Sequence, residues 1–484
     1  MSTISVLDRR GGSVLLDDAA LSDLRGSLRG SLLLPSDPAY DAARSIWNGM
    51  IRRRPALVVR CAGAEDVARA VRFVRQRDLV FSVRSGGHNI AGTSLCDDGV
   101  VIDLSALKDI RVDPGTRTVR VEAGCTLGDV DRATQPHGLA VPSGIVSETG
   151  IAGLTVGGGF GWLTRRHGYT SDNLLSAQVV LPDGRSVAAS PSENADLFWA
   201  VRGGGGNFAI VTSFEFLAHP LGPDVVAGMM VWPLQQAPEV MPFYRAFAAS
   251  LPEEAGSLLV IRPAPPAPFL PQEAHGTPIV GIAGMYAGPL EEGARVFAPL
   301  REVGRPLGGG MAPKPFLAHQ AMFDAGQPRG RQYYWKSEYL EGLTEDTDRI
   351  LLEHGRRIES PHTAILCFQL GGAMARVPEE SSAAGHRSAG FVVNVAGAWD
   401  DPAEADRHVG WVRGCWEELR PHSTGTYVNF LTQDDDEARV RAAYGSNYER
   451  LSALKAEYDP GNALRANQNI RPARVHVSRT PSLG

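Results

Sequence analysis

The stretch Phe81-Ser82-Val83-Arg84-Ser85-Gly86-Gly87-His88-Asn89 joins a short β-type run to a glycine turn that ends at a histidine. Because glycine has no Cβ, Gly86 and Gly87 can adopt positive φ and let backbone N–H groups converge on an anion. A Gly-Gly pair after a strand is most often only a turn, so the pattern gains weight from a second glycine cluster farther along the chain. We interpret the stretch as a pyrophosphate cradle, with His88 where a cofactor ring could reach it.

The second cluster is Gly150-Ile151-Ala152-Gly153-Leu154-Thr155-Val156-Gly157-Gly158-Gly159-Phe160-Gly161-Trp162, in which six of thirteen residues are glycine. Each glycine costs a helix roughly 1 kcal/mol relative to alanine, so we expect neither a regular helix nor a strand. The segment is too apolar for a solvated linker, and it lacks the Gly-X-Y period of collagen. Tight packing is one interpretation; the one that fits best is a buried backbone that lies against a flat ligand.

The composition is that of a soluble globular protein. The chain has 484 residues, 43% of them hydrophobic and 21% charged, and its length predicts two or three domains. A formal net charge of −6 argues against nucleic acid or an anionic membrane as a partner. No apolar leader and no run of eighteen apolar residues is present, so we expect a cytoplasmic location. The cysteines form neither a CxxC site nor a disulfide framework: Cys61, Cys96, Cys125, Cys367 and Cys415. No pattern indicates an oligomeric state.

The first 220 residues predict a β-α-β unit, in which the helix over 64–74 has apolar residues at helical spacing. Its strands cover 55–60 and 80–83. The further elements expected in this part are strands over 100–104, 118–122 and 209–216, helices over 37–47, 127–135 and 196–202, and a hairpin over 176–188.

Beyond Leu217 the pattern is typical of one antiparallel sheet with helices on one face. Strands are expected over 225–232, 257–262, 279–286, 333–339, 364–370 and 390–399, and helices over 235–250, 289–303, 344–359 and 402–421. Alternation in one strand puts Tyr333, Trp335, Ser337 and Tyr339 on one face, and Tyr334, Lys336 and Glu338 on the other. A last helix is expected over 447–455.

Four motifs in order carry a family resemblance: Arg84–His88, Gly150–Gly161, Asp196–Gly204, and Tyr458-Asp459-Pro460 with Asn467-Gln468-Asn469-Ile470. Together they resemble the berberine-bridge-enzyme-like flavoproteins of the vanillyl-alcohol-oxidase superfamily, over residues 45–475. The resemblance implies FAD as cofactor. It also implies an α+β fold, with a PCMH-type FAD-binding domain of two subdomains and an antiparallel-sheet substrate domain covered by helices on one face.

The expected organisation follows from the resemblance and from the change in composition. It comprises an N-terminal segment (1–50), the FAD-binding domain (51–220), the substrate domain (221–422), a C-terminal return to the FAD domain (423–475) and a disordered tail (476–484).

The resemblance also implies how the flavin is held. His88 matches the histidine that is bonded covalently to the flavin 8α-methyl group. Val146 stands where many relatives have a second linking cysteine, so a single link is expected, as in the bacterial 6-hydroxynicotine-oxidase-like members; Cys125 is not expected to substitute. Thr149 matches a position that borders the oxygen-access pocket, where its small size leaves access open, although it could serve only as a turn residue.

The expected FAD contacts come from the glycine motifs and the positions that accompany them in the family. They are Arg84, Ser85, Gly86, Gly87, His88, Asn89, Pro142, Ser143, Gly144, Thr149, Gly150, Gly153, Gly157, Gly158, Gly159, Gly161, Asn173, Val211, Tyr427, Asn429 and Asn467. No metal is expected.

The chemistry implied is removal of hydride from a C–H next to O or N of a small organic substrate, with O2 reoxidising the flavin to give H2O2. The base that removes the accompanying proton is left open between Tyr427, which lies beside Asn429 in a Tyr-x-Asn motif, and Lys336. Either group needs a shifted pKa for that role, and ordinary packing or a solvated strand face is the competing interpretation. Thr149 completes the expected catalytic set.

Other polar residues are given weaker roles. Pocket-lining candidates are Trp335, Tyr339, Gln369, Asn394 and Trp399. The pair His386-Arg387 recurs in the family and is expected to be structural. Asp434-Asp435-Asp436 is expected to be a solvated loop rather than a metal site, because no partner ligands follow at a suitable spacing.

Two alternatives remain at this stage. One is a dehydrogenase or an oxygenating enzyme of the same fold, and the other is a catalytically silent flavin-binding protein. A Rossmann enzyme that uses NAD is disfavoured, because no G-x-G-x-x-G follows a first strand with an acidic residue about twenty positions later.

Overall fold

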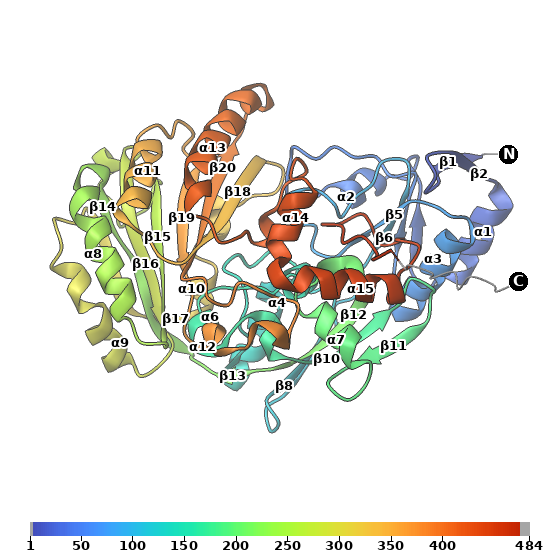
Figure 1. The fold of residues 1–484 in the computed structure, drawn as a ribbon, viewed down its shortest axis with the longest axis horizontal. Coiled ribbons are helices and arrows are strands. Elements are labelled where there is room, and N and C mark those ends of the chain that lie inside the picture. Colours follow the sequence, from blue (N-terminus) through green and yellow to red (C-terminus); the bar gives the residue numbers. More distant parts are fainter. Residues whose placement is uncertain (1–2, 475–484) are drawn as a thin grey trace, which may run out of the picture.

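The computed structural model describes residues 3–474, so the predicted tail 476–484 lies outside the described residues. The chain forms an elongated molecule with two halves, each built on β-sheet with helices outside it (Figure 1). Both ends of the described chain lie in the same half, so the C-terminal segment returns to the part of the molecule in which the chain begins.

The first half contains a four-stranded sheet in the order β3 (Ser31–Leu33), β4 (Leu57–Arg60), β6 (Val100–Asp103) and β5 (Phe81–Arg84). The predicted β-α-β unit is present as β4, α3 (Ala64–Gln76) and β5, with β6 inserted between its two strands and parallel to both. The strand β3, from the N-terminal segment, pairs antiparallel with β4.

A five-stranded antiparallel sheet completes the first half. Its order is β11 (Ser186–Ala189), β10 (Leu174–Val180), β12 (Ile210–Leu217), β8 (Thr118–Glu122) and β7 (Ile110–Asp113). Further elements around the two sheets include the β1 (Ile4–Leu7) and β2 (Ser13–Leu16) hairpin, α1 (Asp18–Ser27), α2 (Tyr40–Arg44), α4 (Leu127–Thr134) and α7 (Ala195–Val201). The core of this half also takes in Val440, Leu451 and Ile470, so α14 (Glu437–Tyr444) and α15 (Tyr448–Tyr458) pack here.

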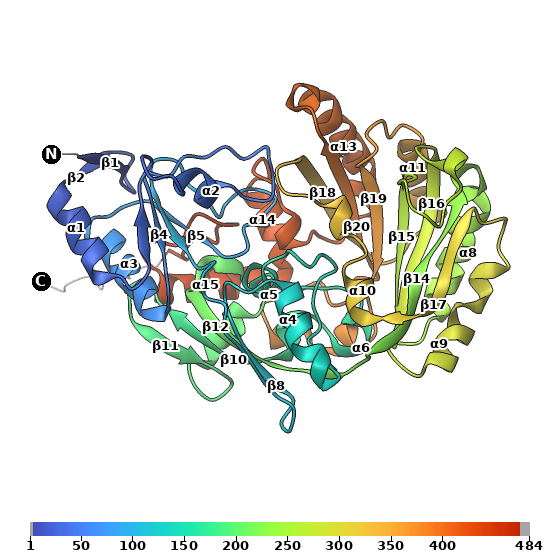
Figure 2. The ribbon, with the colours of Figure 1, turned by 180° about the vertical axis from the view of Figure 1, so that it is seen from behind.

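The second half is a seven-stranded antiparallel sheet. Its order is β17 (Gly308–Pro315), β14 (Asp224–Pro233), β16 (Pro278–Tyr286), β15 (Ala255–Pro263), β19 (Ala364–Gln369), β20 (Phe391–Trp399) and β18 (Gln332–Leu340). One face carries α8 (Ala237–Ser250), α9 (Leu290–Phe297), α11 (Glu345–Gly355) and α13 (Ala405–Leu419), and the other faces the first half (Figure 1 and Figure 2). The predicted α+β class is confirmed.

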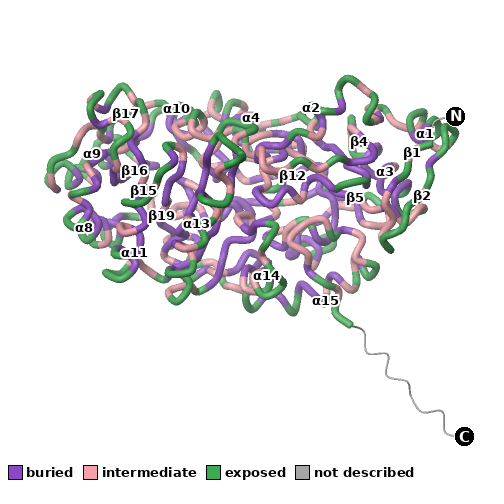
Figure 3. Tube along the Cα trace, turned by 90° about the horizontal axis from the view of Figure 1, so that it is seen from above, coloured by how far each residue is buried: buried purple, intermediate pink, exposed green. Residues whose placement is uncertain are grey.

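Burial follows this layering. Buried segments continue from the interior of one half into the other, whereas exposed residues gather at outer loops and on the outer surfaces of helices (Figure 3). The strand β17 was not expected, because Gly308-Gly309-Gly310 and two prolines hide the strand pattern. Such a sequence is tolerated here because β17 lies at the edge of the sheet and pairs only with β14.

The second glycine cluster differs from the prediction at its start. Ile151–Val156 forms a short helix, α5, although no helix was expected there. Ile151, Ala152 and Thr155 are buried, and this tertiary packing offsets the low helix propensity of the sequence. After the helix the backbone is irregular as expected, with φ of +104° at Gly158 and +79° at Gly159.

The two glycine segments meet backbone to backbone. A Cβ placed on Gly86 would lie 2.6 Å from the backbone nitrogen of Gly150, and one placed on Gly150 would lie 2.7 Å from that of Gly86. Gly87 has a φ of +66° and turns the chain directly after this contact. The contact fixes the loop that follows β5 against the loop that precedes α5.

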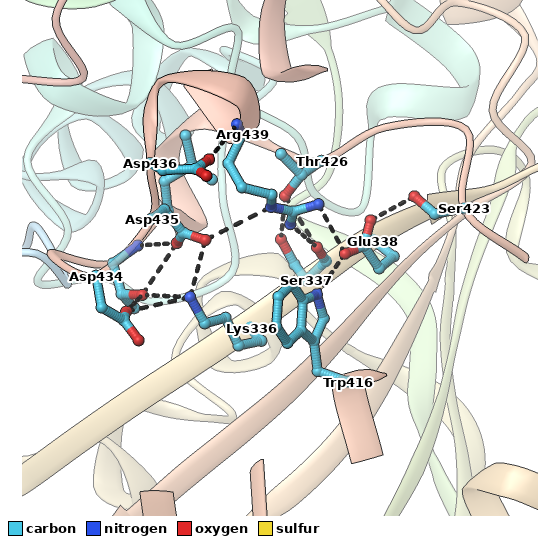
Figure 4. A network of polar contacts seen from close by, with 12 residues as sticks. Lys336, Ser337, Glu338, Trp416, Ser423, Thr426, Asp434, Asp435, Asp436 and Arg439 are labelled. Atoms are coloured by element: carbon cyan, nitrogen blue, oxygen red, sulfur yellow. Dashed lines mark hydrogen bonds and ion pairs between the residues drawn. The ribbon is translucent and has the colours of Figure 1, made fainter. Parts of the chain in front are cut away.

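A polar network ties the C-terminal return to the helix-covered face of the large sheet (Figure 4). Lys336 on β18 donates to Thr432 and forms ion pairs with Asp434 at 3.1 Å and Asp435 at 2.8 Å. The side chains of Lys336 and Asp435 are only 3% and 1% exposed. The interpretation of residues 434–436 as a solvated loop is therefore wrong for Asp435, which a lysine far away in sequence draws into the interior.

We expect the Lys336–Asp435 pair to be essential to stability. Lys336→Met removes the nearer of two cations from the buried Asp435 carboxylate and leaves only Arg439 at 3.5 Å, which should lower the free energy of unfolding by about 1–3 kcal/mol in urea denaturation. The double variant Lys336→Met, Asp435→Asn should recover part of that loss, because no buried charge at position 435 then needs a partner. A single variant as stable as the wild type would contradict this role.

The contact between Gly86 and Gly150 gives a matched test. In Gly150→Ala the new methyl group meets backbone that cannot move aside, so the unfolding free energy should fall by about 1–3 kcal/mol or more. Gly153 lies in α5, and a Cβ added to it would have no atom within 4 Å. When both variants are compared as flavin-free protein, Gly153→Ala should therefore leave stability unchanged or raise it by up to about 1 kcal/mol. Equal urea denaturation curves for the two variants would be incompatible with the contact.

Candidate functional site

A cavity of about 330 Å³ lies where the two halves meet. This volume is in the range of small-molecule sites in proteins. One side is formed by residues 85–89 of the first glycine segment and by residues between 144 and 156 in and before the second. The opposite side is the helix-free face of the large sheet, and residues 427–430 and 464–468 of the C-terminal return complete the wall.

Most of the predicted FAD contacts line this cavity, although they come from five separate parts of the sequence. Those that do are Ser85, Gly86, Gly87, His88, Asn89, Gly144, Thr149, Gly150, Gly153, Val211, Tyr427, Asn429 and Asn467. Those that do not are Arg84, Pro142, Ser143, Gly157, Gly158, Gly159, Gly161 and Asn173.

Several members of the second group support the wall from behind. Gly157 leaves room for Asn429, because a Cβ on Gly157 would overlap the Asn429 side-chain amide. Gly161 packs against Ser143, whose carbonyl oxygen occupies the space that a Cβ on Gly161 would need. Asn173 donates to the carbonyl of Tyr169 at 2.9 Å. Gly157 and Gly161 therefore shape the site without facing the cavity, and Asn173 holds the backbone at Tyr169.

His88 lies in the cavity wall as a neutral imidazole. Its ring stacks on Trp47 with a centroid distance of 4.3 Å and an interplanar angle of 17°. Its Nε2 atom is buried and has no hydrogen-bond partner among the described residues. Burial and the nearby Arg329 guanidinium lower the pKa of His88 to about 3, so the ring is uncharged at neutral pH. Trp47 has no signal in the sequence as a site residue, because only the tertiary fold brings it to His88.

Tyr427 and Asn429 form a hydrogen-bonded pair on the C-terminal return. The Tyr427 hydroxyl oxygen accepts from the Gly159 N–H at 3.1 Å and from the Asn429 Nδ2 atom at 2.9 Å. Burial raises the pKa of Tyr427 well above its usual value, despite these two donors. The hydroxyl is therefore protonated at neutral pH, and its hydrogen is left to donate toward a ligand.

Lys336 does not reach the cavity. The predicted alternation of β18 is confirmed, since Trp335 lines the cavity while Lys336 lies on the face that packs against α13. Its ammonium group is already held by Asp434 and Asp435. This position does not support Lys336 as the base, and no other lysine lines the cavity in residues 3–474.

Of the five pocket-lining candidates, Trp335 and Asn394 line the cavity and three do not. Gln369 accepts from Ser257 at 2.7 Å and belongs to the opposite face of the sheet. Trp399 packs in the core beneath the helices. Tyr339 lies behind Tyr427, where its hydroxyl is 3.5 Å from that of Tyr169. The strands that carry these five residues were predicted correctly. Which face of each strand lines the cavity depends on tertiary structure.

The structure also gives the positions of the other residues singled out in the sequence. Arg387 forms a buried ion pair with Asp172 at 2.6 Å, which is a structural role for the His386-Arg387 pair. Thr149 and Val146 line the cavity, whereas Cys125 is fully buried and does not. Within residues 3–474, no cluster of side chains is suited to hold a metal ion, and no helix is long and apolar enough to cross a membrane.

Sequence reasoning missed the floor of the cavity. The large sheet contributes seven further residues, and the strand register is needed to predict that their side chains face the cavity. They are Val260, Arg262, Ala364, Leu366, Phe368, Ala396 and Ala398. Gly205 and Gly206 also line the cavity, and their signal was present as a run of four glycines.

The glycine side of the cavity fits a dinucleotide. A Cβ added to Gly153 would have no atom within 4 Å, and one added to Gly206 would have only Asn467 at 4.0 Å, so both glycines leave space that a side chain would fill. Backbone free of side chains allows close approach to phosphates, and the buried unpartnered nitrogen of His88 stands in the same wall.

Comparison with known proteins agrees with this geometry. Family models described as "FAD binding domain" and "Berberine and berberine like" match residues 55–190 and 426–471. An FAD-linked oxidoreductase from Dictyostelium discoideum is 32% identical over 88% of this chain and 91% of its own length. The (R)-6-hydroxynicotine oxidase of Paenarthrobacter nicotinovorans is 30% identical over 92% of this chain and 97% of its own.

Solved structures give the same result. The 6-hydroxy-D-nicotine oxidase of Arthrobacter nicotinovorans superimposes with a TM-score of 0.82 at 27% identity, covering 92% of this chain and 99% of that one. BBE-like 1 from Physcomitrella patens shares the fold with a TM-score of 0.84 at 22% identity, covering 94% and 100%. The chain therefore belongs to the berberine-bridge-enzyme-like family with a PCMH-type FAD-binding fold, and it is an FAD-dependent oxidoreductase.

Proposed function

We propose that this enzyme is an oxidase with FAD linked covalently through His88 alone, acting on a C–H bond next to O or N of a small organic substrate. The observation that carries the proposal is the neutral imidazole of His88, whose buried Nε2 atom has no hydrogen-bond partner among the described residues, in the wall that the two glycine segments form. When bound, FAD supplies the two-electron acceptor for hydride and the means of passing both electrons to O2 as H2O2.

The wall residues support covalent attachment at one position. A ring nitrogen can form a bond to carbon only while it carries a lone pair, and the low pKa of His88 keeps the imidazole neutral at neutral pH. Stacking on Trp47 holds the ring in one orientation. Val146 lines the same cavity and offers no thiol, and Cys125 does not reach it, which supports a single link.

Tyr427 is proposed as an orienting donor rather than as the resting base. Its hydroxyl oxygen is occupied by two donors, and its raised pKa opposes loss of the proton in the resting enzyme. The remaining hydroxyl hydrogen can bind an oxygen or nitrogen atom of the substrate. Asn429 fixes Tyr427 through one amide hydrogen and donates to the Leu154 carbonyl at 3.3 Å, which ties both residues to α5.

A dehydrogenase is the second candidate, and the size of Thr149 favours the oxidase over it. Thr149 lines the cavity beside Gly150, and in the family a bulky residue at the matching position hinders reaction with O2. The small side chain in this enzyme supports open access.

The covalent link is tested by acid precipitation. We expect wild-type protein to carry its yellow colour into the pellet and His88→Ala to release free flavin into the supernatant, because only a covalent bond survives unfolding. Cys125→Ala is the matched control and should keep the colour. Free flavin from the wild type, or a coloured His88→Ala pellet, would refute attachment at His88.

Oxygen access is tested without knowing the substrate. Enzyme reduced with dithionite and mixed with O2 in a stopped-flow instrument should reoxidise rapidly with one H2O2 per flavin. Thr149→Ile should slow this step severalfold by filling the space beside Gly150, and Thr149→Ser should not. Slow reoxidation of the wild type, or no effect of the isoleucine, would favour the dehydrogenase.

A further inference from the structure

Asn394 brings an amide without a partner to the sheet side of the cavity. Its side chain lines the cavity, and the residue is only 1% exposed. Its Oδ1 atom is buried and accepts no hydrogen bond from any described residue. An amide oxygen has lone pairs and no hydrogen, so it can bind only a group that donates. A buried acceptor without a donor is costly, and the position therefore suits a ligand that supplies a hydrogen.

Strand register surrounds this amide with apolar side chains. Val260 pairs with Leu366, and Leu366 with Asn394, so these three form a row across β15, β19 and β20. Ala396 shares the Asn394 face because it lies two residues farther along β20, and it lines the cavity with the others. Trp335 pairs with Ala396, so it is a diagonal neighbour of Asn394, and its Nε1 atom has no acceptor among the described residues. A hydroxyl group placed here has an acceptor for its hydrogen and a donor nearby for its oxygen.

The other polar side chains on this side are already bonded or lie elsewhere in the wall. Arg262 donates to two proline carbonyls at 3.1 and 3.0 Å, and His362 is bound to Asp400 at 2.9 Å. Gln327 has an unpartnered Oε1 atom, but its backbone carbonyl accepts from Trp47 at 3.0 Å. Since that indole stacks on the histidine proposed to hold the flavin, Gln327 belongs to the end of the cavity where the flavin is linked.

The charges in the wall do not suit a cationic substrate. No aspartate or glutamate side chain lines the cavity in residues 3–474, and Arg262 is its one permanently charged side chain. An amine next to the reacting C–H bond is protonated at neutral pH, and its charge would be buried without a counter-ion. A sugar would bring several hydroxyl groups to a floor whose side chains around Asn394 are apolar.

We propose that the substrate is an uncharged, otherwise apolar alcohol whose hydroxyl group donates to Asn394 Oδ1. The proposal rests on the proposed function, in which this face of the cavity receives the substrate. A site that hydrogen-bonds a substrate hydroxyl discriminates strongly against an analogue that lacks it, because the buried acceptor is then left unpaired. Asn394 is thus a specificity-determining residue.

The test uses three ligands without a C–H bond next to O or N: 4-chlorophenol, 4-chlorotoluene and 4-chlorobenzamidine. Each is titrated into the holoenzyme at pH 7 in a calorimeter, which reports binding however the flavin is attached. Hydroxyl and methyl groups are similar in size, so a purely apolar pocket would favour the toluene. We expect the phenol to bind about tenfold more tightly than the toluene, as one hydrogen bond to a buried acceptor provides, and the amidinium ion most weakly. Equal or tighter binding of the toluene, tightest binding of the amidinium, or no binding of the phenol would overturn the proposal.

Variants show whether the amide oxygen of Asn394 makes this choice. Asn394→Leu should reverse the order of phenol and toluene, because the acceptor is replaced by apolar surface. Asn394→Asp keeps the shape of the side chain and should make the amidinium bind at least tenfold more tightly than it does to the wild type, because a carboxylate pairs with it. Gln327→Leu is the matched control: it removes the other unpartnered amide and should keep the preference for the phenol. A preference that survives in Asn394→Leu, an unimproved amidinium in Asn394→Asp, or a preference lost in Gln327→Leu would refute the assignment.

Failure of the proposed function gives a different result. Free flavin after acid precipitation, or slow reaction of the reduced enzyme with O2, would contradict that function and leave these dissociation constants unchanged. Covalent flavin and rapid reoxidation together with the wrong order of ligands would contradict only the role of Asn394.

Discussion

The backbone contact between Gly86 and Gly150 is the constraint on which the site depends. The first residue follows a strand of the parallel sheet, and the second precedes a helix that closes the cavity from another part of the chain. Their close approach is possible only because neither residue has a Cβ. It places His88, which comes two residues after Gly86, in the same wall as the open backbone of α5.

The two sides of the cavity differ in chemistry, and this difference divides their roles. The glycine side offers backbone and one neutral imidazole, which suits a dinucleotide. The sheet side offers apolar side chains with a few unpartnered polar groups, which suits recognition of a small molecule. Tyr427 and Asn429 lie on the C-terminal return, where they are hydrogen-bonded to each other. The ion pair between Lys336 and Asp435 attaches this return to the large sheet, so the return contacts both halves of the molecule beside the cavity.

Much of this arrangement could be predicted from sequence, because periodicity reports local structure. The β-α-β unit, six of the seven strands of the large sheet, the four helices that cover it, the alternation of β18 and the glycine loops were predicted, whereas β1, β2, β3, β7, α1 and α14 were not. The strand β17 was not, since glycine and proline obscured it, and α5 was missed because its stability comes from burial rather than propensity. The face of Lys336, the contribution of Trp47 and the position of Arg262 depend on packing between elements far apart in sequence, which no local pattern encodes.

The central claim is that two distant glycine segments form one cofactor site. The most direct measurement is amide hydrogen exchange on flavin-free His88→Ala protein, before and after addition of FAD. The account predicts that residues 84–89 and 150–157 gain protection together. Protection of only one of these segments, or of neither while FAD binds, would contradict it.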